Sequence, residues 1–150
     1  MKRIVSIILI LCGLMSVFGC QKNRNLVSVK ATQTKLSVGD TTTVQVCFNK
    51  MEGVRSFAIR PEIDEESFVI VSARNLAGGF IEDTSNGIVS SLFIEDEEFK
   101  KDVVAEFVIR ATSAGKRKPI AFNVSVFGEN DVKIEVSQPE IIYINVKDKK

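Results

Sequence analysis

After Asn25 the chain keeps one rhythm, in which Val, Ile and Phe alternate with polar residues in short runs. Such alternation places every second side chain on the same face of an extended strand, so that one face meets a core and the other meets water. The clearest run is 103–111, where an apolar residue stands at every second position. Gly, Asn, Asp or Pro interrupt the runs at intervals close to those of a β-sandwich. The sequence therefore predicts an all-β domain.

About nine strands are expected, at 27–31, 44–48, 54–59, 68–73, 88–94, 103–111, 120–126, 132–136 and 141–146. The run 68–73 is apolar almost throughout, which suits a strand buried on both faces. Turns are expected at 37–40, at Asn86-Gly87 and at 128–131. No helical period of useful length and no internal repeat is visible.

The residues before this domain have the pattern of a secretory signal. Lys2 and Arg3 precede an apolar run that ends at Gly19-Cys20 and is too short for a spanning helix. Val17-Phe18-Gly19-Cys20 resembles the lipobox of bacterial lipoproteins, in which the cysteine is acylated and becomes the mature N-terminus. We therefore expect a signal peptide at 1–19, lipid attachment at Cys20 and a short tether at 20–25. The domain would then span 26–146, followed by a charged tail at 147–150, and the alternative is an ordinary secreted protein cut nearby.

The charge balance argues against a nucleic-acid partner. Loss of Lys2 and Arg3 from the 20 basic residues would leave 18 basic against 19 acidic residues, a net charge near −1. A near-neutral chain of this kind lacks the basic footprint of nucleic-acid binders. Cys12 would leave with the signal and Cys20 would be acylated, so Cys47 has no partner for an intramolecular disulfide.

Catalysis is not expected, because the usual catalytic groups are missing. The chain has no His, so Cys47 lacks the base that a thiol nucleophile normally needs, and a small residue on a strand surface is the preferred interpretation. Ser90-Ser91 has neither a nucleophile elbow nor a base. The acidic run Glu95-Asp96-Glu97-Glu98 lacks the spacing and the glycine of a calcium loop, so a solvated loop is preferred over a metal site. No cofactor and no metal are predicted.

The order and spacing of several motifs resemble a cohesin domain over nearly all of 26–146. The motifs are Val-Gly-Asp-Thr at 38–41, Val-Gln-Val-Cys-Phe at 44–48, Gly-Val at 53–54, Phe-Val-Ile-Val-Ser at 68–72, Asn-Gly-Ile-Val at 86–89, Leu-Phe-Ile-Glu-Asp at 92–96 and Val-Val-Ala-Glu-Phe at 103–107. The resemblance implies a nine-stranded jelly-roll sandwich. It also implies an exported protein partner such as a dockerin module of a polysaccharide-degrading enzyme, and dockerins fold around calcium.

The chain departs from this resemblance at the expected partner surface. Cohesins that bind dockerins carry outward polar residues, commonly Asn and Asp, on the third strand, where this chain has Ser56 and Ala58. If the neighbouring strands are arranged as in cohesins, apolar side chains would gather beside Ala58 within a charged rim. The alternative is an ordinary sheet surface. The expected face consists of Ser56, Ala58, Arg60, Leu92, Val104, Glu106, Val108 and Arg110.

Two other functions remain open from the sequence. A carbohydrate-binding module would need exposed aromatic rings to stack on sugars, and the chain has no Trp and only Tyr143 in its last strand. A structural envelope lipoprotein without a retained binding face is the second alternative. Lys116-Arg117-Lys118 is expected to form a basic hairpin tip, which could also contact anionic lipid headgroups.

Overall fold

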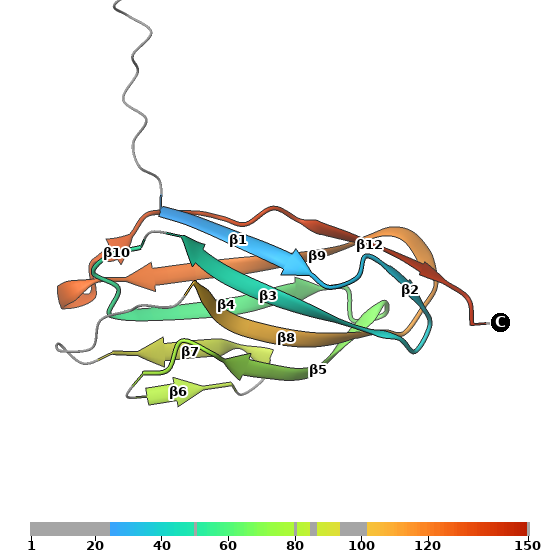
Figure 1. Ribbon diagram of the computed structural model, residues 1–150, viewed down its shortest axis with the longest axis horizontal. Coiled ribbons are helices and arrows are strands. Elements are labelled where there is room, and N and C mark those ends of the chain that lie inside the picture. Colours follow the sequence, from blue (N-terminus) through green and yellow to red (C-terminus); the bar gives the residue numbers. More distant parts are fainter. Residues whose placement is uncertain (1–24, 50, 80, 85–86, 94–101, 150) are drawn as a thin grey trace, which may run out of the picture.

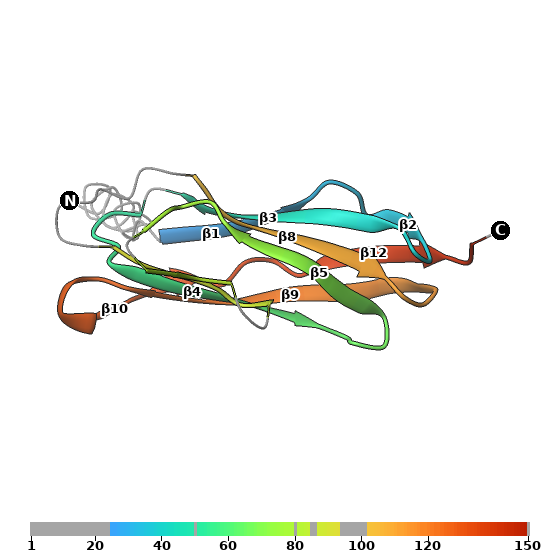
Figure 2. The ribbon, with the colours of Figure 1, turned by 90° about the horizontal axis from the view of Figure 1, so that it is seen from below.

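The computed structural model describes residues 25–49, 51–79, 81–84, 87–93 and 102–149, which form two sheets packed face to face (Figures 1 and 2). Figure 2 shows the two layers edge-on. The predicted signal peptide, Cys20, most of the tether and the acidic run from Glu95 to Glu98 lie outside the described residues.

Sheet 1 has five strands in the order β11-β1-β3-β8-β5. Their bounds are Val136–Ser137 for β11, Asn25–Ala31 for β1, Thr41–Asn49 for β3, Val103–Ala111 for β8 and Phe68–Asn75 for β5.

Sheet 2 has the order β2-β12-β9-β4-β7-β6, and β10 pairs with the end of β9. The bounds are Lys35–Ser37 for β2, Ile142–Lys147 for β12, Gly115–Phe127 for β9, Ser56–Ile63 for β4, Val89–Leu92 for β7, Ile81–Asp83 for β6 and Lys133–Ile134 for β10. A 3-10 turn, Glu129–Asp131, connects β9 to β10.

The predicted all-β sandwich is confirmed, and it follows the jelly-roll plan. The described residues contain more strands than the nine expected, because β2 and β6 are additional three-residue strands and the expected strand at 132–136 is divided into β10 and β11. Strands this short carry too few alternating positions to stand out in a sequence.

The core lies between the sheets and is built from the inward phase of each alternation. Val44, Val46 and Phe48 from β3 are buried, as expected. The Phe48 ring meets Phe57 of β4 edge-on, with ring centroids 5.4 Å apart, and thereby links the two sheets. Burial of each such side chain contributes about 1.5–3 kcal/mol. The inward phase thus fixes which way every long strand faces.

The prediction that 68–73 is buried on both faces is wrong. β5 is the edge strand of sheet 1, and Val69 and Val71 are exposed on its outer surface. The pairing with β8 slips between Ile70 and Ser72, so Val71 is an extra residue in a β-bulge. Phe68 alone of the run is fully packed in the core. An apolar run does not distinguish a central strand from an edge strand with an apolar outer surface.

An open side of the sandwich lies between the edges of β4 and β5. β7 pairs with β4 only as far as Ile59, and beyond that point a groove of about 620 Å³ is lined by residues that include Pro61, Ile63 and Ile88.

The Gln138 side chain bonds both backbone groups of Val124 at 2.9 Å, on the side of β9 away from β4. Ile59, opposite Val124, therefore directs its backbone groups towards β7 rather than β9.

By the same alternation, Pro61 faces the open side of β4. Proline has no backbone N–H, so the unpaired edge lacks one of the donors that an incoming strand would need. The bulge at Val71 interrupts the facing edge of β5 in a similar way. Both edges beside the groove are thus poorly suited to pairing with another chain.

We expect the substitution Pro61→Val to promote self-association, because it restores a backbone N–H on the edge of β4 beyond Ile59, where β7 no longer pairs. Sedimentation velocity over a range of protein concentrations measures this. Asn123→Val is the matched control, since it adds a β-branched residue to β9, where the backbone is already paired with β4. A monomeric Pro61→Val variant at all concentrations would contradict a protective role for Pro61.

Candidate docking surface

The register of sheet 2 brings residues from three strands together on its outer side. Ser56 of β4 stands opposite Phe127 of β9 and Leu92 of β7. Directly opposite residues in neighbouring strands project to the same face, so these three side chains form a row. Ser125, Ala58 and Ser90 form the next row in the same way.

These rows point away from the core because their neighbours point into it. Phe57 and Ile59 of β4 are buried, so the residues between and beside them face outward. Small side chains occupy the centre of the surface, while Leu92, 41% exposed, and the half-buried Phe127 stand at its two sides. We call the surface formed by Ser56, Ala58, Arg60, Ser90, Leu92, Ser125 and Phe127 the β4 face.

One charged group belongs to the β4 face. Arg60 is exposed and stands opposite Asn123 of β9, one row beyond Ala58. It makes no ion pair with any residue that the structure describes. The β4 face therefore combines a centre of small side chains, mostly serines, with an apolar side chain at either side and one cation available to an acidic or carbonyl group.

Half of the predicted face is wrong. Val104, Glu106, Val108 and Arg110 lie on β8, which pairs with β3 and β5 in sheet 1, so they share no surface with Ala58. Alternation shows which side chains share one side of a strand, but it does not show which sheet the strand joins. Ser56, Ala58, Arg60 and Leu92 do lie together on β4 and β7.

Val104 differs from the prediction in a second respect, because it is buried rather than exposed. Val46 pairs with Ala105 and Cys47 pairs with Val103, so Val104 is an extra residue in a bulge of β8. The bulge interrupts the alternation and turns Val104 towards the core.

The sequence reasoning missed Phe127, Ser125 and Ser90. Ser125 falls in the outward phase of the run that was expected at 120–126, and Phe127 continues that phase one position beyond its end, so their orientation could have been read from the sequence. Their place beside Ala58 depends on the antiparallel pairing of β4 with β9, which joins residues about seventy positions apart.

Glu106 has a structural role on the outer surface of sheet 1. Its carboxylate accepts hydrogen bonds from the Arg74 guanidinium and from Gln45 Nε2, the latter at 3.3 Å. The Arg74 bond first, and then the Gln45 bond, hold the pKa of Glu106 below its ordinary value. Glu106 thus ties β5, β8 and β3 together on a surface opposite the β4 face.

Cys47 lies on the outer side of β3 opposite Ser28 and Val103, but it is buried rather than on the surface as predicted. Burial raises the pKa of its thiol, so the reactive thiolate is disfavoured at neutral pH.

No metal centre is found among the residues that the structure describes, since no three Asp, Glu or Cys side chains gather closely enough to hold an ion. Within the same part of the chain, no helix has the length and apolar character needed to cross a membrane.

Comparison with solved structures shows that the chain has the cohesin fold. A type I cohesin from the OlpC cohesin–dockerin complex of Clostridium thermocellum matches with a TM-score of 0.58 and 15% identity over 87% of this chain and 99% of that one. A type II cohesin domain from the cellulosome of Acetivibrio cellulolyticus matches with a TM-score of 0.64 and 15% identity over 81% and 95% of the two chains. The third ScaC cohesin of the same organism, solved with the ScaB dockerin, gives 0.63 and 16% over 80% and 98%.

The sequence itself matches no protein-family model and no curated protein. The cohesin-like jelly roll implied by the order of the motifs is nevertheless confirmed at the level of fold.

The substitution Glu106→Gln tests the role of Glu106. Because the folded protein lowers the pKa of this carboxyl below the free value of about 4.3, its contribution is present above that pH and is lost as pH falls through the folded pKa. We expect the variant to be about 0.2–1 kcal/mol less stable at pH 7 and equal to wild type at low pH, as measured by urea unfolding. If the difference in unfolding free energy between variant and wild type persists at low pH, this role is contradicted. The same holds if the exposed control Glu62→Gln shows an equal difference.

Proposed function

We propose that this chain is a non-catalytic docking module that binds an exported protein through the β4 face. The observation that carries the proposal is the row Phe127–Ser56–Leu92 beside the row Ser125–Ala58–Ser90, a shelf of small side chains with a larger apolar one on either side of Ser56. Partner helices or strands approach such a shelf closely, because no long side chain stands at its centre. Aromatic residues and arginine are enriched at protein interfaces, and Phe127 and Arg60 supply both to this surface.

The cohesin fold supports a partner related to dockerins, because two of the compared cohesins were solved in complex with dockerins. The chemistry of the β4 face implies a different balance of contacts from the dockerin-binding cohesins. Ala58 neither donates nor accepts a side-chain hydrogen bond, so apolar burial of Leu92 and Phe127 would carry a larger share of the interface. Arg60 would supply a charged contact at the rim, and the partner is expected to place an acceptor opposite it.

We further propose that the module is held at the cell envelope by acylation of Cys20. Two acyl chains give a lasting anchor where one chain does not. The tether at 20–25, fully extended at about 3.5 Å per residue, would keep the domain within roughly 20 Å of the membrane. A partner bound to the β4 face would then be retained near the surface of the cell.

Substitution of the β4 face tests the docking function. We expect Leu92→Lys and Ala58→Asp each to weaken capture of the partner about tenfold or more, because both place a charge where the interface must exclude water. Val69→Lys is the matched control, since Val69 is as exposed as Leu92, at 41%, but lies on sheet 1. The measurement immobilises the purified protein, applies exported proteins of the source organism and identifies those retained by mass.

Calcium distinguishes the kinds of partner in the same experiment. Capture of dockerin-bearing enzymes that a chelator releases would support a cohesin role. Capture of another protein that survives chelation would support docking of a different partner. Retention that is unchanged in both Leu92→Lys and Ala58→Asp would remove the β4 face as the binding surface. No capture at all would favour a glycan ligand or a structural role.

Cys20→Ser tests the proposed anchor separately. The variant lacks the thiol that accepts the acyl chains, so we expect it to move from the membrane fraction to the soluble fraction after cell breakage. Cys12→Ser leaves Cys20 in place and is the matched control. Persistence of Cys20→Ser in the membrane fraction would show that the protein is held there by other means.

A further inference from the structure

The hairpin end of sheet 2 carries an irregular pair of cationic residues that the proposed docking function does not use. Ile144 pairs with Lys118 and Val146 pairs with Gly115, so Lys116 and Arg117 of β9 together stand opposite the single Asn145 of β12. This is a β-bulge, a feature that redirects side chains and often lies next to functional sites. Here it directs two adjacent cations outward from the sheet.

Arg117 occupies a backbone conformation that normally favours glycine. Its φ angle is 51°, in the left-handed region that costs a residue with a Cβ atom free energy. Two contacts hold it there. Its backbone N–H donates to Asn145 Oδ1 at 3.0 Å, and its guanidinium lies over the Tyr143 ring, 4.8 Å from the centroid. An arginine with a strained backbone thus occupies a position where glycine would adopt the same φ angle without strain. This indicates a functional role for the arginine side chain.

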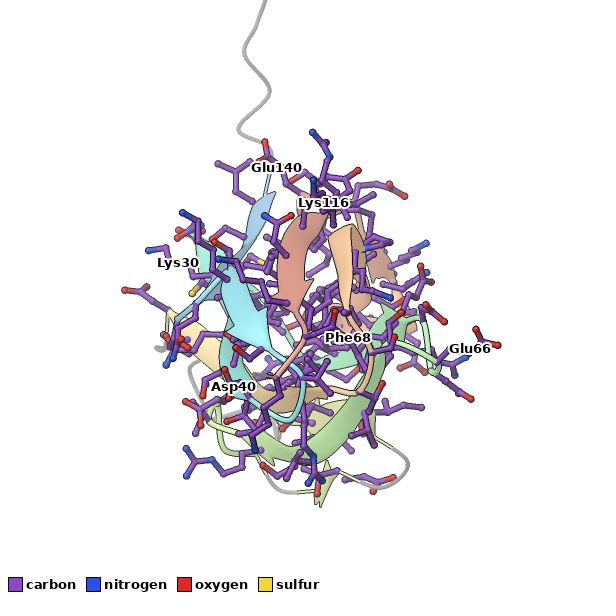
Figure 3. The ribbon with its side chains drawn as sticks, turned by 90° about the vertical axis from the view of Figure 1, so that its right-hand side faces the viewer. Lys30, Asp40, Glu66, Phe68, Lys116 and Glu140 are labelled. Carbon is purple, nitrogen blue, oxygen red and sulfur yellow. The ribbon has the colours of Figure 1, made fainter. Side chains whose placement is uncertain are left out.

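The stacked guanidinium is the centre of a wider basic area. Lys116 and Arg117 are exposed, as are Lys35 of β2, which pairs with Asn145, and Lys147, the last residue of β12. Lys118 is not part of this area, because its Nζ donates to Ser67 Oγ at 2.5 Å and to Ser113 Oγ at 3.2 Å. Figure 3, which views this end of the molecule, shows Lys116 well apart from Glu66 and Asp40. We call Lys35, Lys116, Arg117, Tyr143, Asn145 and Lys147 the basic patch.

The composition of the basic patch indicates an extended polyanion rather than a folded protein. Lysine is depleted from the centres of protein interfaces, whereas cations spread over several strands can meet the repeated charges of a polymer. The planar guanidinium of Arg117, held by Tyr143, suits a carboxylate, with which it makes two parallel hydrogen bonds. Its stacking also covers one face of the Tyr143 ring, so recognition there would be ionic rather than by stacking of a sugar.

The position of the basic patch argues against the membrane as its ligand. β9 has 13 residues and spans about 40 Å from the basic patch at Gly115 to Phe127. Phe127 pairs with β10, and β11 follows directly to pair with Asn25 at the start of β1. Figure 1 shows β10 and the start of β1 at the same end of the sandwich. The proposed tether therefore leaves the domain at the opposite end of β9. The basic patch would face away from the anchoring membrane, towards polymers outside it.

From these observations we propose that the basic patch binds a carboxylated polysaccharide outside the membrane, with Arg117 as its central contact. This is a second interaction surface, on the same sheet as the β4 face and independent of it. Binding weakens as salt rises, because exposed charges carry it.

Affinity electrophoresis of the purified protein in gels containing polygalacturonate at low salt tests this proposal. Wild type is retarded, and Arg117→Gly raises the dissociation constant about tenfold, as expected for loss of a hydrogen-bonded charge. Because glycine adopts φ 51° freely, the Tm of Arg117→Gly does not fall. Lys35→Ser, which leaves the strained position intact, also weakens binding.

Lys133→Ser is the charge-matched control, since Lys133 is exposed on β10 at the far end of β9 and its loss should leave binding unchanged. Four results would overturn the proposal: no retardation of wild type, equal weakening by Lys133→Ser, wild-type binding by Arg117→Gly, or binding to anionic lipid vesicles without binding to polygalacturonate. A lower Tm with unchanged binding would assign Arg117 a structural role only.

Discussion

Burial of alternate side chains between two sheets is the constraint on which this structure depends. Each long strand commits its inward phase to the core, as Val44, Val46 and Phe48 do on β3 and as Phe57 and Ile59 do on β4. The commitment fixes the outward phase at the same time, because successive side chains of a strand point to opposite sides. A one-residue slip of β4 would bury Ser56 and Ala58 and expose Phe57 and Ile59. The outward orientation of the β4 face is therefore fixed by the same burial that forms the core beneath it.

Departures from regular pairing account for the features that distinguish this sandwich. The bulge in β8 turns Val104 inward, the bulge in β5 leaves Val71 exposed, and the bulge in β9 directs Arg117 onto Tyr143. Where β9 lacks a neighbouring strand, the Gln138 amide takes the place of one by bonding both backbone groups of Val124. The backbone is thereby satisfied at a gap in the sheet, and Pro61 limits pairing at the edge where no such substitute is present.

The two proposed surfaces use the same sheet by different physical means. The β4 face lies over β9, β4 and β7, where small and apolar side chains favour burial against a protein. The basic patch lies over β9, β12 and β2, where exposed cations favour an anionic polymer. Since the long strand β9 contributes to both, a rigid element separates them. A module of this kind would hold a protein partner and a surface polymer at once without one displacing the other.

The sequence by itself determined the all-β class, the inward and outward phases of the long strands and the jelly-roll plan that the order of the motifs implies. Those properties depend on local alternation and on the spacing of turns, which are visible in a single chain. Only the tertiary structure decided which sheet each strand joins, that β5 lies at an edge, that Cys47 is covered and that Phe127 and Leu92 stand on either side of Ser56. Alternation is the same for a strand in either sheet, so the choice comes from pairing and packing between residues far apart in the chain. The prediction that set β8 beside β4 was wrong for that reason.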